Sequence, residues 1–231
     1  MELRLGVALA VVWPDAAALG NAAERRAGRR VGIFGGTFDP IHGGHLAVAS
    51  AAAEELDLDA VYFVPAGDPY LRRPPVASIG DRIAMVELAI AGDDRFLLST
   101  VDAERPGPTY SVDTVEDVRT AAGTNAALYL IVGADAALQL ARWREPDKLA
   151  AATTIVVVGR PDQLSPIDLP AGHPARDATF VNMPQLDVSG TVIRDALANG
   201  RPITGMVPPE VERYIHSKGL YSPRSTYREE R

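Results

Sequence analysis

The chain has 231 residues, of which 47% are hydrophobic and 23% are charged, and this composition excludes a largely disordered protein. Its 30 acidic residues outnumber its 23 basic residues, so the formal net charge is −7 and no nucleic-acid partner is expected. Cysteine is absent, which excludes disulfides, thiolate-bound metals and cysteine nucleophiles. A cytoplasmic location is expected, in keeping with this lack of cysteine.

Residues 3–13 form an apolar run near the N-terminus. The run is shorter than the roughly 20 apolar residues of a membrane helix, so no membrane association is expected. A signal peptide carries its basic residues before the apolar run, whereas the arginine cluster at 25–30 follows it. Secretion is therefore the less favoured alternative to a dispensable extension. We expect an N-terminal extension, one domain and a C-terminal tail, over residues 1–29, 30–221 and 222–231.

Apolar runs and helical patterns alternate along the rest of the chain. Short runs of β-branched and aromatic residues indicate strands, and apolar residues at helical spacing or Ala-rich stretches indicate helices. In chain order, the pattern predicts a strand at 30–34, a helix at 46–56, a strand at 60–65, a helix at 81–91, a strand at 96–101, a helix at 112–122, a strand at 128–132, a helix at 135–143, strands at 153–158 and 179–183, and helices at 191–198 and 209–217.

This alternation predicts βαβ units and a parallel sheet of five or six strands with helices on both faces. The runs at 128–132 and 155–158 are apolar throughout, as burial on both faces of the sheet requires. The expected fold class is α/β, with one doubly wound domain. Ligands of such sheets bind beyond the carboxyl ends of the strands, so candidate site residues are expected just after each strand.

The segment after the first predicted strand is the most informative one. It reads Gly35-Gly36-Thr37-Phe38-Asp39-Pro40-Ile41-His42-Gly43-Gly44-His45. Paired glycines let the backbone and its N–H groups approach a ligand closely. The following helix is expected to begin near Gly43 or Gly44, and a helix N-terminus favours phosphate. His42 and His45 are three residues apart, so they share a helix face and both rings reach one anion.

Other nucleotide and metal motifs are missing from the chain. There is no G-x-x-x-x-G-K-[ST] motif and no G-x-G-x-x-G motif, which disfavours a P-loop protein and a dinucleotide-dependent oxidoreductase. Two histidines without cysteine or an H-E-x-x-H glutamate do not predict a zinc site, and no metal ligands are expected in the protein. The alternative for His42 and His45 is a purely structural role in capping or packing.

The eleven-residue loop resembles the nucleotide loop of the H-x-G-H nucleotidyltransferases, and within them that of the bacterial nicotinate-nucleotide adenylyltransferases. Later segments agree with this family in order and spacing: residues 107–114, 133–135, 143, 160–161, 188–194, 214–215 and 220–221. The resemblance covers about residues 30–221. It implies a Rossmann-like nucleotidyltransferase fold and transfer of the adenylyl group of ATP to nicotinate mononucleotide, which gives deamido-NAD and pyrophosphate.

The residues are consistent with such a reaction. The attacking 5′-phosphate is already an anion near pH 7, because its second pKa is about 6, so no general base is needed. Transfer requires two anions held in line and stabilisation of the charge that develops. Mg²⁺ is the expected cofactor, bound mostly by water and substrate oxygens. The expected partners are the small molecules ATP and nicotinate mononucleotide.

The resemblance assigns roles to three groups of residues. The catalytic pair is His42 and His45. The ATP-binding residues are Gly35, Gly36, Thr37, Phe38, Gly133, Asp135, Ser189, Thr191 and Arg194. The residues for the second substrate are Thr109, Trp143 and Arg160, with the Trp143 indole expected to stack on the pyridine ring.

Several of these assignments have a plain structural alternative. Ser189 is a good N-cap residue, so it and Arg194 fit ordinary helix capping beside a surface arginine. Asp135 fits an N-cap for a helix that begins near residue 136, and Trp143 fits the core face of a helix. The family usually has serine where this chain has Gly190. For the whole protein, the alternatives are a sister enzyme with another phosphate acceptor and a non-catalytic nucleotide-binding module.

Overall fold

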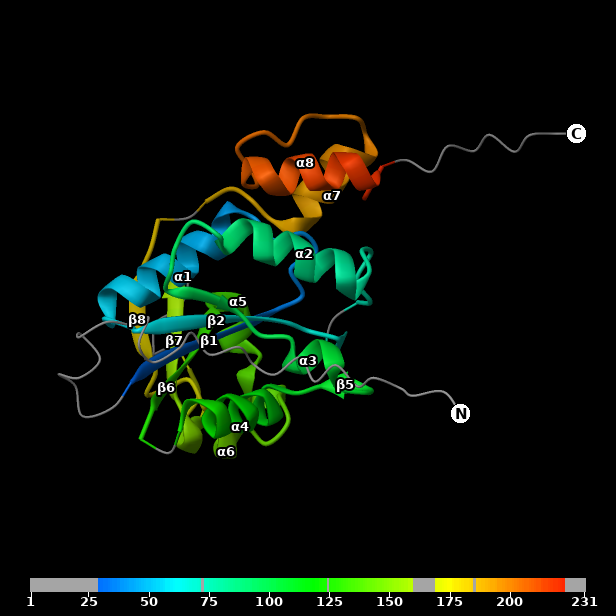
Figure 1. Ribbon diagram of the computed structural model, residues 1–231. Helices are drawn as coiled ribbons and strands as arrows, with labels where there is room; N and C mark the ends of the chain where they lie inside the picture. Colours follow the sequence, from blue (N-terminus) through cyan, green and yellow to red (C-terminus); the bar gives the residue numbers. More distant parts are fainter. Residues whose placement is uncertain (1–28, 72, 124, 160–168, 185, 223–231) are drawn as a thin grey trace, which may run out of the picture.

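The computed structural model describes residues 29–71, 73–123, 125–159, 169–184 and 186–222. Its centre is a six-stranded parallel sheet with helices on both faces (Figure 1). In spatial order the strands are β4 (Phe96–Leu98), β2 (Ala60–Pro65), β1 (Arg30–Gly36), β6 (Ala127–Gly133), β7 (Thr154–Gly159) and β8 (Thr179–Asn182). The chain builds outward from β1 to β4, then crosses back to place β6 on the other side of β1. The predicted doubly wound parallel α/β domain is confirmed.

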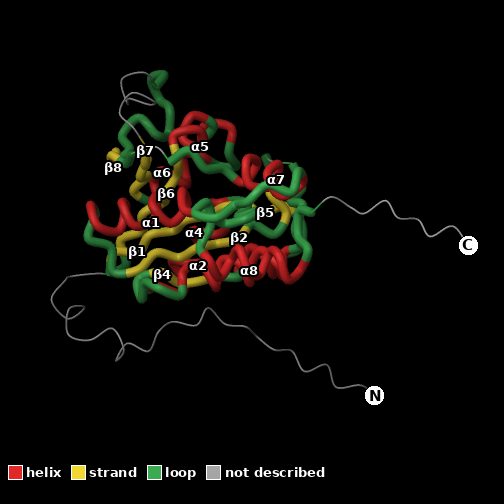
Figure 2. Tube along the Cα trace, turned by 90° about the horizontal axis from the view of Figure 1, so that it is seen from above, coloured by secondary structure: helices red, strands yellow, loops and turns green. Residues whose placement is uncertain are grey.

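The helices form two layers. One face carries α1 (Gly43–Glu55), α2 (Ile79–Ile90), α7 (Gly190–Ala198) and α8 (Pro209–Lys218). The other face carries α3 (Val101–Glu104), α4 (Ser111–Ala122), α5 (Ala134–Leu138) and α6 (Pro146–Ala152). Viewed from above, α8 lies beside α2 (Figure 2), and the Tyr214 hydroxyl of α8 donates to Asp81 of α2.

Each layer encloses its own hydrophobic core, and the strands alternate between the two. On β2, Val61 and Phe63 pack into the core under α1 and α2, whereas Tyr62 and Val64 pack into the core over α4 and α6. This period of two is the side-chain pattern of a strand buried on both faces. Since both cores are filled, ligands are left with the edge of the sheet at which the parallel strands end.

The structure differs from the predicted elements in several places. The strand predicted at 96–101 ends at Leu98, because Thr100 caps the short helix α3 and its hydroxyl donates to Glu104 over 2.7 Å. The helix predicted at 135–143 is two pieces, α5 and a 3₁₀ turn at Leu140–Arg142. Helix α6 was not predicted from the sequence, although Pro146 is its first residue and proline is favoured there.

A second, two-stranded sheet was also not predicted. It pairs β3 (Asp68–Pro69) with β5 (Pro108–Thr109) in parallel. Two-residue strands that contain proline carry no periodic pattern, so the sequence gives no signal for them. The small sheet brings residues 68–70 next to 107–110, two segments that are about forty positions apart. Among the described residues, no helix is long and apolar enough to cross a bilayer.

Candidate active site

The nucleotide loop, residues 35–45, connects β1 to α1 at the point where the strand order reverses. Gly35 is exposed, whereas the Phe38 ring folds back into the core and is buried. A Cβ on Gly36 would lie 2.8 Å from the Phe38 ring, so only glycine allows this fold of the loop. Phe38 itself has a left-handed backbone with φ of 49°, which a bulky residue rarely adopts. Phe38 therefore anchors the loop in the core with its side chain.

His42 and His45 lie in the first turn of α1, where their rings stack. The ring centroids are 3.7 Å apart and the planes differ by 24°. His42 is the N-cap residue, and its backbone N–H donates to Nδ1 of His45 over 3.2 Å. Because Nδ1 accepts this hydrogen bond, the neutral His45 ring carries its hydrogen on Nε2. His45 thus has the tautomer in which Nε2 is the hydrogen-bond donor.

The environment of His42 keeps its ring uncharged. The side chain is 8% exposed, and burial lowers its pKa to about 4. Gly44 makes room for the ring, because a Cβ on Gly44 would lie 3.0 Å from Nδ1 of His42. At pH 7 the His42 ring is therefore uncharged, so it offers an anion a hydrogen bond rather than a preformed charge.

The N-terminus of α7 provides a second group of donors. Ser189 is the N-cap residue of this helix, and its hydroxyl accepts from the Val192 N–H over 3.2 Å. The predicted N-cap is thus confirmed. Ser189 and Thr191 are exposed, and Thr191 accepts from Nη2 of Arg194 over 3.2 Å. The helix N-terminus, two hydroxyls and one guanidinium make an arrangement suited to an anion.

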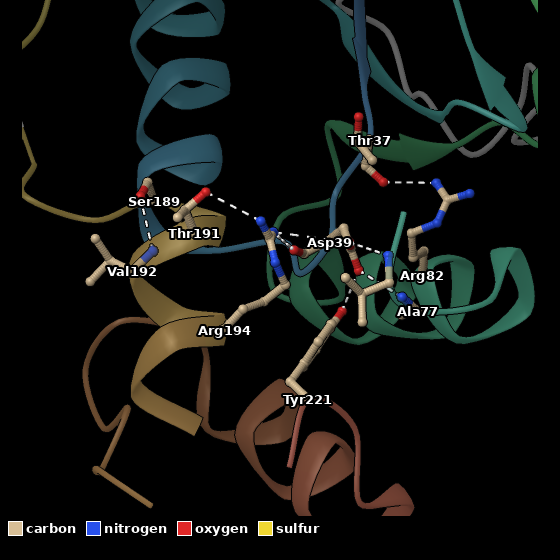
Figure 3. A network of polar contacts seen from close by, with 10 residues as sticks. Thr37, Asp39, Ala77, Arg82, Ser189, Thr191, Val192, Arg194 and Tyr221 are labelled. Carbon is tan, nitrogen blue, oxygen red and sulfur yellow. Dashed lines mark hydrogen bonds and ion pairs between the residues drawn. The ribbon is translucent and has the colours of Figure 1, made fainter. Parts of the chain in front are cut away.

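Arg194 is more than a surface residue. Its Nη1 donates to the backbone carbonyl of Asp39 over 2.6 Å and lies 3.9 Å from Oδ2 of the same residue (Figure 3). The guanidinium of α7 is thereby tied to the nucleotide loop, 155 residues away in the chain. This contact rules out the surface-arginine alternative and brings the two predicted phosphate-binding segments together.

Asp39 was given no role in the sequence analysis, yet it connects four segments. Its carboxylate accepts from the backbone N–H groups of Val76 (2.7 Å) and Ala77 (3.0 Å), and from the Tyr221 hydroxyl (2.7 Å). We call Asp39, these three donors and Arg194 the Asp39 network (Figure 3). No local sequence signal marks it, because its partners come from positions far apart in the chain.

Arg82 is a second residue without a predicted role. It is 1% exposed, and its Nη1 donates to the carbonyls of Thr37 and Ala66, each over 2.8 Å. Burial lowers its pKa, and the nearby Asp39 carboxylate partly offsets this effect. Arg82 thus fixes the loop after β1 to the loop after β2. A signal was present, since Arg82 is three residues from Met85 and so lies on the apolar face of α2.

The small sheet forms a third part of the site. The Thr109 hydroxyl is buried and donates to the Asp68 carbonyl over 3.2 Å, so it ties β5 to β3. Next to it, the Tyr110 ring lies 4.9 Å from the Tyr70 ring, and the Arg144 guanidinium lies 4.6 Å above Tyr110. Tyr70 and Arg144 are exposed and Tyr110 is half-buried, and the three come from segments that are far apart in the chain.

Trp143 and the end of β6 complete this region. Trp143 is half-buried, caps the 3₁₀ turn and packs against the core over α4 and α6. Gly133, not Asp135, is the N-cap of α5, so the capping alternative for Asp135 is wrong and its exposed carboxylate lies within the first turn. Arg160 lies outside the described residues. Among the residues that are described, no three acidic or histidine side chains form a metal-binding group.

Comparison with known proteins agrees with this arrangement. A family model described as cytidylyltransferase-like matches residues 33–196. A probable nicotinate-nucleotide adenylyltransferase of Acidothermus cellulolyticus is 40% identical over 197 residues, covering 83% of this chain and 94% of the relative. A protein of the same name from Neisseria meningitidis serogroup B is 42% identical over 200 residues, covering 84% of this chain and 98% of the relative.

A solved structure shares the fold. It is the nicotinic acid mononucleotide adenylyltransferase of Plasmodium falciparum in complex with NaAD, with a TM-score of 0.67 and 18% identity. The match covers 84% of this chain and 97% of that protein. Sequence relatives, the fold and the arrangement of the H-x-G-H loop agree: the chain belongs to the cytidylyltransferase-like family and, within it, to the nicotinate-nucleotide adenylyltransferases.

Proposed function

We propose that the protein transfers the adenylyl group of ATP to the 5′-phosphate of nicotinate mononucleotide, producing deamido-NAD and pyrophosphate. One observation carries the proposal: the His42–His45 pair at the start of α1 and the donors at the start of α7 are joined through the Asp39–Arg194 contact. Two helix N-termini, each with cationic or hydrogen-bonding side chains, suit one polyphosphate. Relatives that carry the name of this enzyme cover most of the chain.

The chemical step needs positioning more than proton transfer. An oxygen of the mononucleotide phosphate attacks the α-phosphorus of ATP, and the bond between that phosphorus and the bridging oxygen of pyrophosphate breaks. The attacking oxygen is already an anion, so no residue has to remove a proton. In the proposed roles, Nε2–H of His45 donates to the α-phosphate, and His42 and the loop backbone at Gly35 and Thr37 donate to the neighbouring oxygens. These hydrogen bonds strengthen as charge moves onto the leaving pyrophosphate.

The remaining predicted residues are assigned to the ribose and terminal phosphates of ATP and to the nicotinate ring. Gly133 and Asp135 lie at the carboxyl end of β6, next to the end of β1, and we assign them to the ribose of ATP. Ser189, Thr191 and Arg194 hold the terminal phosphates. Trp143 and the backbone of the small sheet bind the nicotinate ring.

Magnesium enters this proposal with ATP. The residues on the phosphate side are histidine, arginine and hydroxyl groups, and the carboxylate of Asp39 is occupied by three donors. This donor set fits a cation held by phosphate oxygens and water rather than by the protein. Bound Mg²⁺ would neutralise part of the charge on the triphosphate. We also assign the protein to the cytoplasm, where ATP is supplied and a chain without cysteine needs no oxidising compartment.

The direct test is pyrophosphate release from ATP with a panel of acceptors. Purified protein with ATP and Mg²⁺ would be given nicotinate mononucleotide, nicotinamide mononucleotide or phosphopantetheine, and the products identified by mass. We expect rapid release with the first acceptor and formation of deamido-NAD. Release with phosphopantetheine alone would identify a sister enzyme instead. ATP binding without release for any acceptor would identify a non-catalytic nucleotide-binding module.

A further inference from the structure

Arg194 could be held in two ways by Asp39, and the structure shows only one of them. Nη1 makes its short contact, 2.6 Å, with the backbone carbonyl, and stays 3.9 Å from the carboxylate oxygen Oδ2. An arginine prefers a bidentate pair with a carboxylate when both are available. Such a pair would neutralise the guanidinium and weaken its attraction for phosphate. Other contacts of the Asp39 carboxylate must therefore prevent it from competing with ATP phosphates for the Arg194 guanidinium.

The Asp39 carboxylate instead accepts hydrogen bonds from three donors other than Arg194. Two are the backbone N–H groups at 76 and 77, just before α2, and the third is the Tyr221 hydroxyl. Asp39 is 7% exposed, so water contributes little to this solvation. Removing one of the three donors would leave a lone pair of a buried carboxylate unsatisfied, and Arg194 is the nearby cation that can fill it.

Tyr221 is suited to this task. It follows α8 and reaches Asp39 from the opposite end of the described chain (Figure 3). Its backbone has φ of 62°, in the left-handed region that a bulky residue rarely adopts, and such outliers concentrate at functional sites. Burial raises the pKa of its hydroxyl above the ordinary range, and the hydrogen bond to Asp39 raises it further. The hydroxyl therefore stays protonated and remains a donor.

Gly190 shows that the contact between Asp39 and Arg194 is closely fitted. A Cβ at this position would lie 3.0 Å from the Asp39 carbonyl oxygen and 3.1 Å from Nη1 of Arg194. Any side chain there would press on both members of the hydrogen bond.

We propose that Asp39 and Tyr221 are positioning residues that hold Arg194 ready for the triphosphate of ATP. The Asp39 carbonyl fixes the guanidinium, and the Tyr221 hydroxyl keeps the Asp39 carboxylate from capturing it. The C-terminal segment, which touches no phosphate itself, thereby sets the affinity for ATP. This proposal deepens the proposed function and rests on it for the identity of the ligand.

The test compares two tyrosines of the C-terminal segment. Tyr221→Phe removes the donor to Asp39, whereas Tyr214→Phe removes a similar hydroxyl that donates to Asp81 over 3.0 Å, outside the network. For each variant, the melting temperature, kcat and the KM of both substrates would be measured. We expect Tyr221→Phe to raise the KM for ATP about 3- to 10-fold, the range of one hydrogen bond, with little change in kcat or in the KM for the acceptor. Tyr214→Phe should leave all three constants unchanged.

A double-mutant cycle separates positioning from general structural damage. Because Tyr221 acts through Arg194, Tyr221→Phe should have no further effect on the KM for ATP in an Arg194→Ala background. If Tyr221→Phe raised the KM for ATP by the same factor in the Arg194→Ala background as in the wild type, the proposal would be overturned. A KM for ATP that stays at the wild-type value in Tyr221→Phe, or one that rises equally for both substrates, would overturn it as well.

Calorimetric titration of ATP without acceptor keeps this test independent of the reaction. A wild-type protein that binds ATP but transfers nothing would contradict the proposed function alone. Weaker ATP binding in Tyr221→Phe than in Tyr214→Phe would still support the positioning role. Equal ATP affinity in wild type and Tyr221→Phe would reject that role even if adenylyl transfer were fully active.

Discussion

The two sides of the site are built in different ways. The phosphate side, residues 35–45 and 189–194, consists of two helix N-termini and a glycine loop, and a part-buried hydrogen bond from Arg194 to Asp39 connects them. The ring side, residues 68–70, 107–110 and 142–144, consists of short loops around a sheet of two-residue strands. Its rings at 70 and 110 meet at 4.9 Å, and Tyr70 is 53% exposed.

This difference matches what each side is proposed to recognise. Phosphate is bound by backbone N–H groups and helix ends, which a short contiguous motif can encode. A planar ring is bound by side-chain faces, and these come from whichever loops the fold brings together. The phosphate side should therefore tolerate few changes, whereas the ring side should tolerate several with graded effects. Four experiments would test this contrast.

The largest effect is expected at His45. His45→Ala removes a donor fixed by the His42 backbone, and loss of one donor to a developing oxyanion typically lowers the rate by about 10²–10³-fold. We expect kcat to fall by this factor while the melting temperature changes little. His216→Ala is the matched control, since that histidine lies exposed on α8. Wild-type turnover in His45→Ala would show that the catalytic role assigned to His45 is wrong.

The next effect concerns acid stability, because burial shifts the pKa values of His42, at the start of α1, and Asp102, in α3, in opposite directions. Burial lowers the pKa of His42 to about 4, so the unfolded chain binds an extra proton between pH 4 and 6.5 and folding weakens as the pH falls. Burial raises the pKa of Asp102 to about 6, although the Thr114 hydroxyl opposes this shift. Between pH 4 and 6 the folded chain therefore binds the extra proton, and Asp102 weakens folding as the pH rises.

The two contributions should nearly cancel in the wild type. Each amounts to at most about 3 kcal/mol, at 1.4 kcal/mol per pKa unit. In Asp102→Asn, the free energy of unfolding should fall by up to about 3 kcal/mol from pH 6.5 to 4, and in His42→Asn it should rise by a similar amount from pH 6 to 4. Denaturant titrations across this range would measure both slopes. Parallel slopes in the two variants would contradict the assignment of opposite shifts.

A moderate effect is expected on the ring side. Stacking on Trp143 cannot tell nicotinate from nicotinamide, so the choice depends on N–H donors that suit a carboxylate but not an amide NH₂. The Thr109 hydroxyl is already used by Asp68, which leaves the backbone for this purpose. When the NH₂ group of nicotinamide faces such donors, they are left without an acceptor. This weakens transition-state binding by about 1–3 kcal/mol, which lowers kcat/KM roughly 10- to 100-fold.

We therefore expect nicotinate mononucleotide to be preferred by that factor, with both substrates used less well by Trp143→Ala. Both mononucleotides would be measured with one enzyme preparation, so that the ratio of their kcat/KM values does not depend on the concentration of active enzyme. Equal values would reject the donor argument. Unchanged kinetics in Trp143→Ala would assign the indole to the core against which it packs.

The smallest effect is expected from the N-terminal extension. Strand β1 begins at Arg30, which pairs with Ala127 of β6, so the sheet needs no earlier residue. Deletion of residues 1–28 should leave the melting temperature and both KM values unchanged on either side of the site. Loss of folded protein after the deletion would show that this segment packs on the domain, and its cleavage with export would favour a signal peptide.

Most of the fold and the phosphate side of the site could be predicted from the sequence. Residues 128–132 and 155–158 were predicted as buried strand segments because burial on both faces makes them continuously apolar, and the helix start at 43 follows from glycines next to His42. Ser189 was predicted as an N-cap from its own residue type. These features are local, so a window of a few residues contains them.

The parts that could not be predicted depend on distant contacts. Asp39 lies inside the recognised loop, but its role requires knowing that Tyr221 and Arg194 arrive beside it. The pairing of residues 68 and 108 has no periodic pattern, because neither two-residue strand is long enough to have one. Only Arg82 had a usable signal, as a charged residue at an apolar position of α2.

The hydrogen bond between Tyr221 and Asp39 spans 182 residues, and this span has a consequence for biosynthesis. The last strand of the central sheet ends at Asn182, so all six strands have been synthesised before α8 and Tyr221 are added. A nascent chain can therefore begin to assemble the sheet before it gains full affinity for ATP. The nucleotide would stabilise the finished polypeptide more than the nascent chain, since ligand stabilisation grows with affinity.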